Sequence, residues 1–292
     1  MEDTRRTGVR MEHNDRIRRP EAALRVVEAW EREWMFEYPR LGWDVMDEFD
    51  DAVERWRIGD LAFAAGEYRR LIDEYPEFID AHHHLALLLD RVGREEEAFR
   101  IWQDVVAMGL KCLPARFELG RDLLPWSILE NRPFLRAYHG LGLALLERGE
   151  IEKALDIFNN MLALNPGDNQ GARALAIDCG FRLNRPLDVL AICEQNADDG
   201  MEQVVYGHAL ALYQLGRKVE AERVLREALE FLPLVGRELV KERHRRPKEL
   251  DPNYVTHGGA DQAYYYWIEQ GRHWKNTPGA LGFVKECLST EQ

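Results

Sequence analysis

Residues 165–173, NPGDNQGAR, concentrate the residue types that bind phosphate or carry out catalysis. A phosphate-binding loop of the Walker type would also need a lysine and a preceding strand, and neither is present. The alternative is a corner between two helices, in which Pro166 and Gly167 end one helix and Asp168 caps the next. We favour the corner, because a capping carboxylate occupies the backbone N–H groups that an anion would need.

Three residues of this corner, Asn169, Gln170 and Arg173, are more polar than a junction requires. We predict that they open the next helix. Side chains in that position could donate hydrogen bonds to a bound peptide. The sequence therefore leaves two interpretations open, a plain junction or one edge of a peptide-binding groove.

Three consecutive histidines, His82, His83 and His84, are the first candidates for metal ligands. Consecutive side chains of a helix point about 100° apart, so the three cannot bind one ion together. Asp80 and His84 could supply two ligands at most. We predict no metal site and no other cofactor.

Nucleophilic catalysis requires serine or cysteine close to histidine and an orienting carboxylate. Ser127 and Ser289 are the two serines of the chain. The four cysteines form no C-x-x-C pair, which argues against structural zinc and indicates a reducing compartment. They are Cys112, Cys179, Cys193 and Cys287. We predict no catalytic residues and keep an enzyme as the third alternative.

The composition is that of a soluble folded protein, with 46% hydrophobic residues and a formal net charge of −13. Such acidity opposes nucleic-acid binding, which needs positive charge. No apolar run reaches the roughly 20 residues of a membrane span, and the N-terminus lacks the apolar core of a secretory signal. We expect a cytoplasmic protein that contacts neither a membrane nor, as its main partner, nucleic acid.

One pattern recurs along the chain: a glycine is followed five residues later by an alanine that begins an apolar stripe. The four pairs are Gly59 and Ala64, Gly93 and Ala98, Gly149 and Ala154, and Gly216 and Ala221. The first two glycines are 34 residues apart, and the last two are 67 apart, close to twice that step. A weaker copy that begins at Asn184 fills the gap. Repeats of this length indicate a stack of helix pairs.

The third copy, residues 135–166, shows the pattern most clearly. It carries Tyr138, Leu141, Gly142 and Leu145 on its first expected helix, then Ala154, Phe158, Met161 and Pro166 on and after its second. These spacings resemble the tetratricopeptide repeat, over roughly residues 45–235 in five copies. The resemblance implies an all-α, right-handed superhelix of about five helix pairs. Each helix spans about a dozen residues and is marginal alone, so its neighbours must stabilise it.

The resemblance also implies a non-catalytic scaffold whose first helices line a concave groove for a peptide or protein. Arginines there could bind a carboxylate, and aromatic side chains could act as apolar anchors. The predicted groove residues are His83, Leu87, Asn131, Arg132, Arg136, His139, Asn169, Gln170, Arg173, Tyr206 and Tyr213. The alternative is a self-assembling structural protein that forms a homo-oligomer through its aromatic ends.

The segments outside the repeats complete the expected organisation. We predict a flexible segment at residues 1–20 and a single solenoid domain over residues 21–292. An insertion at about residues 111–133 would be an irregular helical connector, with Trp126 and Leu129 folded back onto the core, or a wall beside the groove.

Residues 21–43 look helical and are rich in aromatic side chains. We predict a helix that caps the first repeat, because the end of a solenoid needs a cover. The alternative is a surface for a partner or a second copy, since exposed tryptophan and tyrosine are typical anchors. The aromatic residues are Trp30, Trp34, Phe36, Tyr38 and Trp43.

The C-terminal part is predicted to form an aromatic helix pair at about residues 260–290. Before it stands a basic cluster, formed by Arg243, Arg245, Arg246 and Lys248. This cluster is either a solvated complement to the acidic surface or a site for an acidic partner or RNA. Residues 170–288 are similar to the suppression-of-tumorigenicity protein seven family, through the element WKNTPGAL at residues 274–281. That resemblance implies a helical-repeat interaction protein and no catalytic residues.

Overall fold

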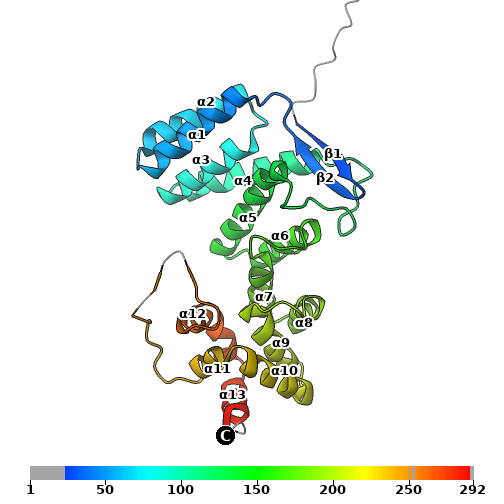
Figure 1. The fold of residues 1–292 in the computed structure, drawn as a ribbon, viewed down its shortest axis with the longest axis vertical. Coiled ribbons are helices and arrows are strands. Elements are labelled where there is room, and N and C mark those ends of the chain that lie inside the picture. The colour runs from blue at the N-terminus through cyan, green and yellow to red at the C-terminus, as the bar shows by residue number, and fades with distance from the viewer. Residues whose placement is uncertain (1–23, 249, 252–253, 290–292) are drawn as a thin grey trace, which may run out of the picture.

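The computed structural model describes residues 24–248, 250–251 and 254–289 (Figure 1). The flexible segment predicted at residues 1–20 lies outside these described residues. Within them the chain forms one two-stranded hairpin, thirteen α-helices and one 3-10 turn. The elements are β1 (Arg25–Trp30), β2 (Glu33–Glu37), α1 (Trp43–Arg57), α2 (Leu61–Glu74), α3 (Ile79–Arg91), α4 (Glu95–Lys111), η1 (Leu129–Asn131), α5 (Arg132–Glu147), α6 (Ile151–Leu164), α7 (Ala172–Arg182), α8 (Pro186–Gln195), α9 (Glu202–Gln214), α10 (Lys218–Phe231), α11 (Pro233–Leu239), α12 (Ala260–Asn276) and α13 (Ala280–Ser289).

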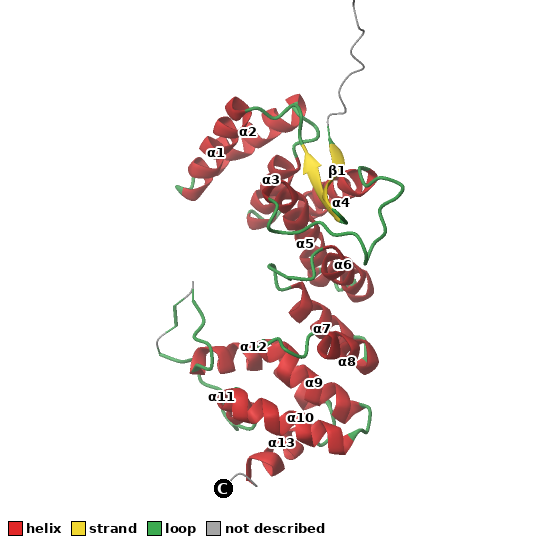
Figure 2. Cartoon of the chain, turned by 45° about the vertical axis from the view of Figure 1, so that its right-hand side comes forward, coloured by secondary structure: helices red, strands yellow, loops and turns green. Residues whose placement is uncertain are grey.

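Helices α1 to α10 form five antiparallel pairs, and each pair contacts the next, so the all-α superhelix is confirmed. Figures 1 and 2 show a curved stack with α1 and α2 at one end and α11 to α13 at the other. The first helices of the pairs, such as α5, α7 and α9, lie toward the concave side of the curve.

The turns within the pairs explain the recurring glycines. Gly59, Gly93, Gly149 and Gly216 all have positive φ, between 74° and 90°. A side chain is strained in that region, so glycine is favoured there. In the fourth pair Asn184 takes this place with φ 53°, which agrees with the weaker copy expected there.

The small residues of the pattern lie where helices approach each other closely. Ala64, Ala98, Ala154 and Ala221 are all fully buried, and larger side chains four residues later complete the core. Of these, Tyr68, Phe158 and Leu225 are fully buried and Trp102 is nearly so. The repeat therefore records the packing of consecutive helices.

Gly142 shows how tightly the third pair is packed. A Cβ atom at Gly142 on α5 would lie 2.6 Å from Cε1 of Phe158 on α6. We expect Gly142→Ala to lower the free energy of unfolding by about 1–3 kcal/mol through overpacking. Gly66→Ala on α2 is the control, because nothing lies within 4 Å of its Cβ position, and it should stabilise the protein by about 0.5–1 kcal/mol. Urea denaturation of both variants checks the pair, and effects of the same sign would contradict the prediction.

The capping helix predicted at residues 21–43 is wrong, because residues 25–37 form the β1–β2 hairpin. Trp34 and Phe36, two residues apart, both point into the core, which is the period of a strand. The hairpin packs against the third helix pair through Phe36 and Phe134, whose ring centroids are 5.0 Å apart. The hairpin therefore covers the third helix pair, which comes about 100 residues later in the sequence, and not the first pair.

The predicted insertion is an extended connector between α4 and α5, with only the short turn η1 being helical. It runs beside the hairpin, where the Trp34 amide donates to the Leu123 carbonyl over 2.9 Å and the Leu123 amide donates to the Arg32 carbonyl over 2.8 Å. Trp126 is partly buried against the core, as predicted. Leu129 is 62% exposed, so the prediction that it folds back onto the core is wrong.

The NPGDNQGAR segment is a corner, as predicted, although α7 begins later than expected. Helix α6 ends at Leu164 and α7 begins at Ala172, so Asn169 and Gln170 lie in the turn instead of opening the helix. Asp168 still performs the predicted cap, because its carboxylate accepts hydrogen bonds from the amides of Ala172 (2.7 Å) and Arg173 (2.9 Å). These bonds occupy the donors that a phosphate would need.

The predicted C-terminal helix pair is confirmed as α12 and α13. Helix α12 contacts α7, α9 and α11, and it lies on the concave side of the last two repeats (Figure 1). The chain therefore fills part of its own concave surface. None of the helices in the described ranges is long and apolar enough to span a membrane.

Candidate protein-binding cleft

The predicted groove residues of the last two repeats are covered by the chain itself. Tyr206 is fully buried and packs against Tyr266 of α12, with ring centroids 5.6 Å apart. Its hydroxyl donates to the Leu232 carbonyl over 2.8 Å. Tyr213 is partly buried and stacks on Phe283 of α13 at 4.9 Å. These tyrosines hold the C-terminal helices in place, so our proposal below does not use them.

Arg173 is also buried and has partners within the chain. It forms an ion pair with Asp199 and donates to the Pro166 carbonyl over 3.1 Å. Asn169 is exposed in the preceding turn and accepts a hydrogen bond from Asn165 at 3.4 Å, while Gln170 is partly buried. This corner joins two repeats, and its buried arginine is already paired within the chain.

The three consecutive histidines have separate partners. His82 contacts the Pro76 carbonyl and His84 the Asp80 carbonyl, each at 2.9 Å, while His83 accepts from Trp102 Nε1 at 3.2 Å. Burial, more than the neighbouring His84, lowers the pKa of His83 to about 3, so this ring is neutral at physiological pH. No three histidine, cysteine or acidic side chains in the described part of the chain converge on a point that could hold a metal ion.

Two further predicted groove residues belong to the packing of the first repeats. Leu87 is partly buried against the core. His139 packs on Phe158 with ring centroids 6.1 Å apart, and burial lowers its pKa. Both side chains therefore contribute to the packing of the helices.

Asn131 and Arg132 organise the connector. Asn131 is fully buried, and its side-chain amide accepts from the Phe36 amide (3.1 Å) and donates to the carbonyls of Trp34 (2.9 Å) and Pro125 (3.1 Å). Arg132 donates to the Trp126 carbonyl over 2.9 Å. Together these bonds fix the end of η1 against the hairpin.

The structure brings Arg132 and Arg136 together in an open cleft of about 480 Å³, which we call the N-terminal cleft. It lies where the hairpin leads into α1 and where α3 and α5 begin. Its lining is Tyr38, Leu41, Met46, Phe78, Asp80, Leu129, Glu130, Arg132, Pro133 and Arg136. The charged members of this lining are Asp80, Glu130, Arg132 and Arg136.

A compensated ion pair forms the polar part of the cleft. Arg136 Nη2 lies 2.6 Å from Asp80 Oδ2, and His84 Nδ1 lies 3.4 Å from Asp80 Oδ1. Burial alone would raise the pKa of Asp80, but its contacts with His84 and Arg136 outweigh burial and lower that pKa. Burial and, secondly, the Asp80 charge raise the pKa of Tyr38, which stays protonated. The cleft is thus mainly apolar, with a neutralised pair beneath it.

Large apolar side chains are exposed beside this cleft. Trp43, in the first turn of α1, is 89% exposed, and Leu129 in the lining is 62% exposed. Met46, which also lines the cleft, follows Trp43 by three residues and so lies on the same face of α1. A soluble chain rarely leaves such side chains together in water unless a partner covers them.

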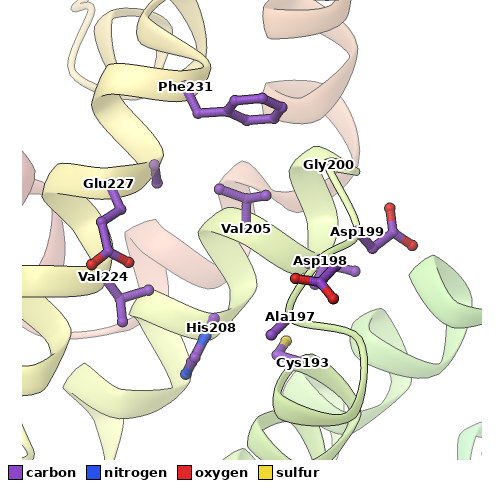
Figure 3. Close-up of a pocket in the computed structure, with 12 residues that line it drawn as sticks. Cys193, Ala197, Asp198, Asp199, Gly200, Val205, His208, Val224, Glu227 and Phe231 are labelled. Atoms are coloured by element: carbon purple, nitrogen blue, oxygen red, sulfur yellow. The ribbon is translucent and has the colours of Figure 1, made fainter.

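A second pocket lies between α8, α9 and α10 and is about 250 Å³ (Figure 3). His208, Asp199 and Glu227 line it, and Figure 3 shows Asp199 and Glu227 on opposite sides. Both carboxylates are already paired, with Arg173 and Arg223 respectively. We interpret this smaller pocket as a gap between repeats.

Residues 37–264 match the family model described as transcriptional repressor TCF25, and this range is more than three quarters of the chain. The chain belongs to the TCF25 family. The TCF25 range begins at the last residue of β2 and extends into α12, so it includes the whole N-terminal cleft. Its helical repeats agree with the scaffold character that both sequence resemblances imply. No curated protein matches this TCF25-family chain by sequence.

Among solved structures, a tetratricopeptide repeat protein from Parabacteroides merdae is similar to this TCF25-family chain. It is 16% identical, with a TM-score of 0.48 over 85% of this chain and 80% of that chain. MamA is 17% identical, with a TM-score of 0.47 over 65% and 92%. YrrB, described as a tetratricopeptide protein with an unusual peptide-binding site, is 15% identical, with a TM-score of 0.44 over 65% and 87%.

The sequence indicated the arginines of the cleft but missed its apolar lining. Leu41, Met46 and Phe78 come from three separate segments, and only folding brings them together. The aromatic stretch from Trp30 to Trp43 was the available signal. Trp30 and Trp43 of this stretch are exposed, as its alternative interpretation as a partner surface would require, whereas Trp34 and Phe36 are buried.

Proposed function

We propose that this chain is a protein-interaction scaffold that binds an apolar segment of a partner protein in the N-terminal cleft. The observation that carries the proposal is a mainly apolar cleft of about 480 Å³ with the exposed Leu129 in its lining. The exposed Trp43 stands about one helical turn before Met46, which also lines the cleft. Exposed tryptophan next to a pocket is typical of the residues that dominate binding energy at protein interfaces. Glu130 and Arg132 form a polar rim that could orient the partner.

The family description, a transcriptional repressor, is compatible with this role. A repressor acts by contacting DNA or by contacting other proteins. The net charge of −13 and the apolar character of the cleft favour contacts with protein. The cytoplasmic location predicted from the sequence remains a prediction. The cleft could bind a partner protein equally well in the cytoplasm or in the nucleus.

Replacing both Trp43 and Leu129 with serine tests the proposal. Peptides selected from a displayed random library against the wild-type protein should bind this double variant at least about tenfold more weakly, because the loss of two apolar anchors removes much of an interface's energy. Fluorescence anisotropy with the selected peptides measures the dissociation constants. Helicity should be unchanged, since both side chains are exposed.

The matched control replaces two exposed apolar residues elsewhere. Ile58→Ser combined with Val219→Ser removes side chains that are 73% and 84% exposed and do not line the cleft. Peptide binding should change less than about twofold. Equal losses in the two double variants, or unchanged binding by the Trp43 and Leu129 variant, would refute the cleft as the site.

A further inference from the structure

The segment between α11 and α12 begins with a basic loop, which we define as residues 241–248. Arg243, Arg245, Arg246 and Lys248 are all exposed. Among the described residues, none of the four forms an ion pair with a carboxylate, including the neighbouring Glu242. Four cations within six residues, none of them paired with a carboxylate of the described residues, are unexpected in a chain whose net charge is −13.

Contacts at the start of the basic loop fix its position. The His244 ring stacks on Trp267 of α12, with centroids 3.5 Å apart and an interplanar angle of 15°. Its Nδ1 lies 3.0 Å from Glu238 Oε1, and Lys241 pairs with the same carboxylate. Trp267 in turn lies beneath the Lys275 ammonium, 4.3 Å from the ring centroid. The neighbouring cations therefore project from a backbone that is anchored to α11 and α12.

The placement of the loop makes it accessible. Figure 1 shows the orange segment after α11 projecting away from the helices of the stack. Arginine presents a fork of N–H groups that matches a carboxylate in two parallel hydrogen bonds. Three arginines and a lysine so placed can each receive an acidic side chain without breaking an ion pair to another described residue.

We infer that the basic loop binds an acidic segment of a partner protein. A nucleic acid fits less well, because its long-range charge would meet the repulsion of the whole acidic chain. A short acidic peptide is affected mainly by charges within about one Debye length, roughly 8 Å at physiological salt, and residues 241–248 carry five lysine or arginine side chains and one carboxylate. This inference goes beyond the proposed function, since the loop and the N-terminal cleft share no residue.

A direct test measures the binding of a labelled oligoglutamate peptide by the full chain at low salt. Changing Arg243, Arg245, Arg246 and Lys248 to glutamine should weaken binding by roughly tenfold or more, because four exposed pairs are lost together. The affinity of the wild-type protein for the peptide should fall as salt is added. The same titration with an oligouridine of equal charge should show weaker binding than the peptide does.

The control removes the same charge from cations that already have partners. Its four substitutions to glutamine are at Arg94, Lys153, Arg217 and Arg223, which pair with Glu97, Glu150, Glu220 and Glu227. Peptide binding by this control should change less than about threefold, since these four cations lie outside the basic loop and their charges are already compensated by glutamates. An equal loss in both quadruple variants, tighter binding of oligouridine, or no binding by the wild-type protein would each overturn the inference. Any of these results leaves the N-terminal cleft untested by itself, so the two proposals can fail separately.

Discussion

Replacing Asn131 with alanine is expected to loosen the β1–β2 hairpin and to lower the free energy of unfolding by about 3 kcal/mol. Asn131 is fully buried and makes three hydrogen bonds to the backbone. Its removal leaves the Phe36 amide and the Trp34 and Pro125 carbonyls without this partner, away from water. Buried groups that lose a partner cost more than the bond itself contributed, which is why the effect should be large.

Urea denaturation measures the loss of stability, and hydrogen exchange at the Phe36 amide reports the hairpin directly. The exchange rate at that amide should rise more than at amides of α9, because the hairpin should open locally before the repeats unfold. Asn169→Ala is the control, since Asn169 is exposed and makes a single long hydrogen bond. Its effect should stay within about 0.5 kcal/mol. Similar stabilities for the two variants would show that Asn131 does not anchor the hairpin.

The repeated helix pairs could be predicted because their requirements are local. Gly149 needs a positive φ to turn the chain, and Ala154 must be small because two helices meet there. Each requirement concerns residues a few positions apart and recurs with the repeat. Several weak signals in phase therefore identify the fold without knowledge of any distant contact.

The hairpin could not be predicted in the same way, because its partners are remote in sequence. Trp30 and Trp34 are four residues apart, which suits a helix, whereas Trp34 and Phe36 are two apart, which suits a strand. The choice is made by Asn131, which is 95 residues beyond Phe36, and by the backbone hydrogen bonds to Leu123 in the connector. Tertiary contacts of this kind override a local pattern.

The candidate site shows the same limit. Arg132 and Arg136 were recognisable as charged residues at the end of the predicted insertion and at the start of the third repeat, and both line the N-terminal cleft. Tyr206 satisfied the same pattern, yet α12 buries it through Tyr266 and Trp274. A helical period identifies the face that a side chain shares with its neighbours. It does not reveal whether another part of the chain covers that face.

Replacing Asp178 with alanine is expected to weaken the docking of α12 and to lower the free energy of unfolding by about 3 kcal/mol. The Asp178 carboxylate lies 2.5 Å from Arg272 Nη2, 2.7 Å from His273 Nε2 and 2.7 Å from Arg182 Nε. His273 is 6% exposed, so it would lose its anionic partner in a largely dry environment. Three donors would then face one another without a carboxylate between them.

The pH dependence identifies the ionised carboxylate as the cause. Burial alone would raise the pKa of Asp178, but hydrogen bonds from His273 and Arg272 outweigh burial and lower that pKa. A carboxylate whose pKa is lowered in the folded state stabilises the protein at pH values above its unfolded-state pKa, which is about 3.9. This stabilisation is lost as the pH falls below that value. The difference in stability between wild-type protein and Asp178→Ala should therefore be full at neutral pH and shrink below about pH 4.

The control is Asp198→Ala, because Asp198 is exposed and therefore remains well solvated when folded. Its effect should stay within about 0.5 kcal/mol at either pH. Hydrogen exchange then separates two ways in which Asp178→Ala could act. Faster exchange in α12 than in α7 would mean that the C-terminal helices open as a unit and uncover Tyr206, whereas equal acceleration would mean that they belong to the same cooperative core. A stability difference that does not diminish in acid would contradict the assigned role of the Asp178 charge.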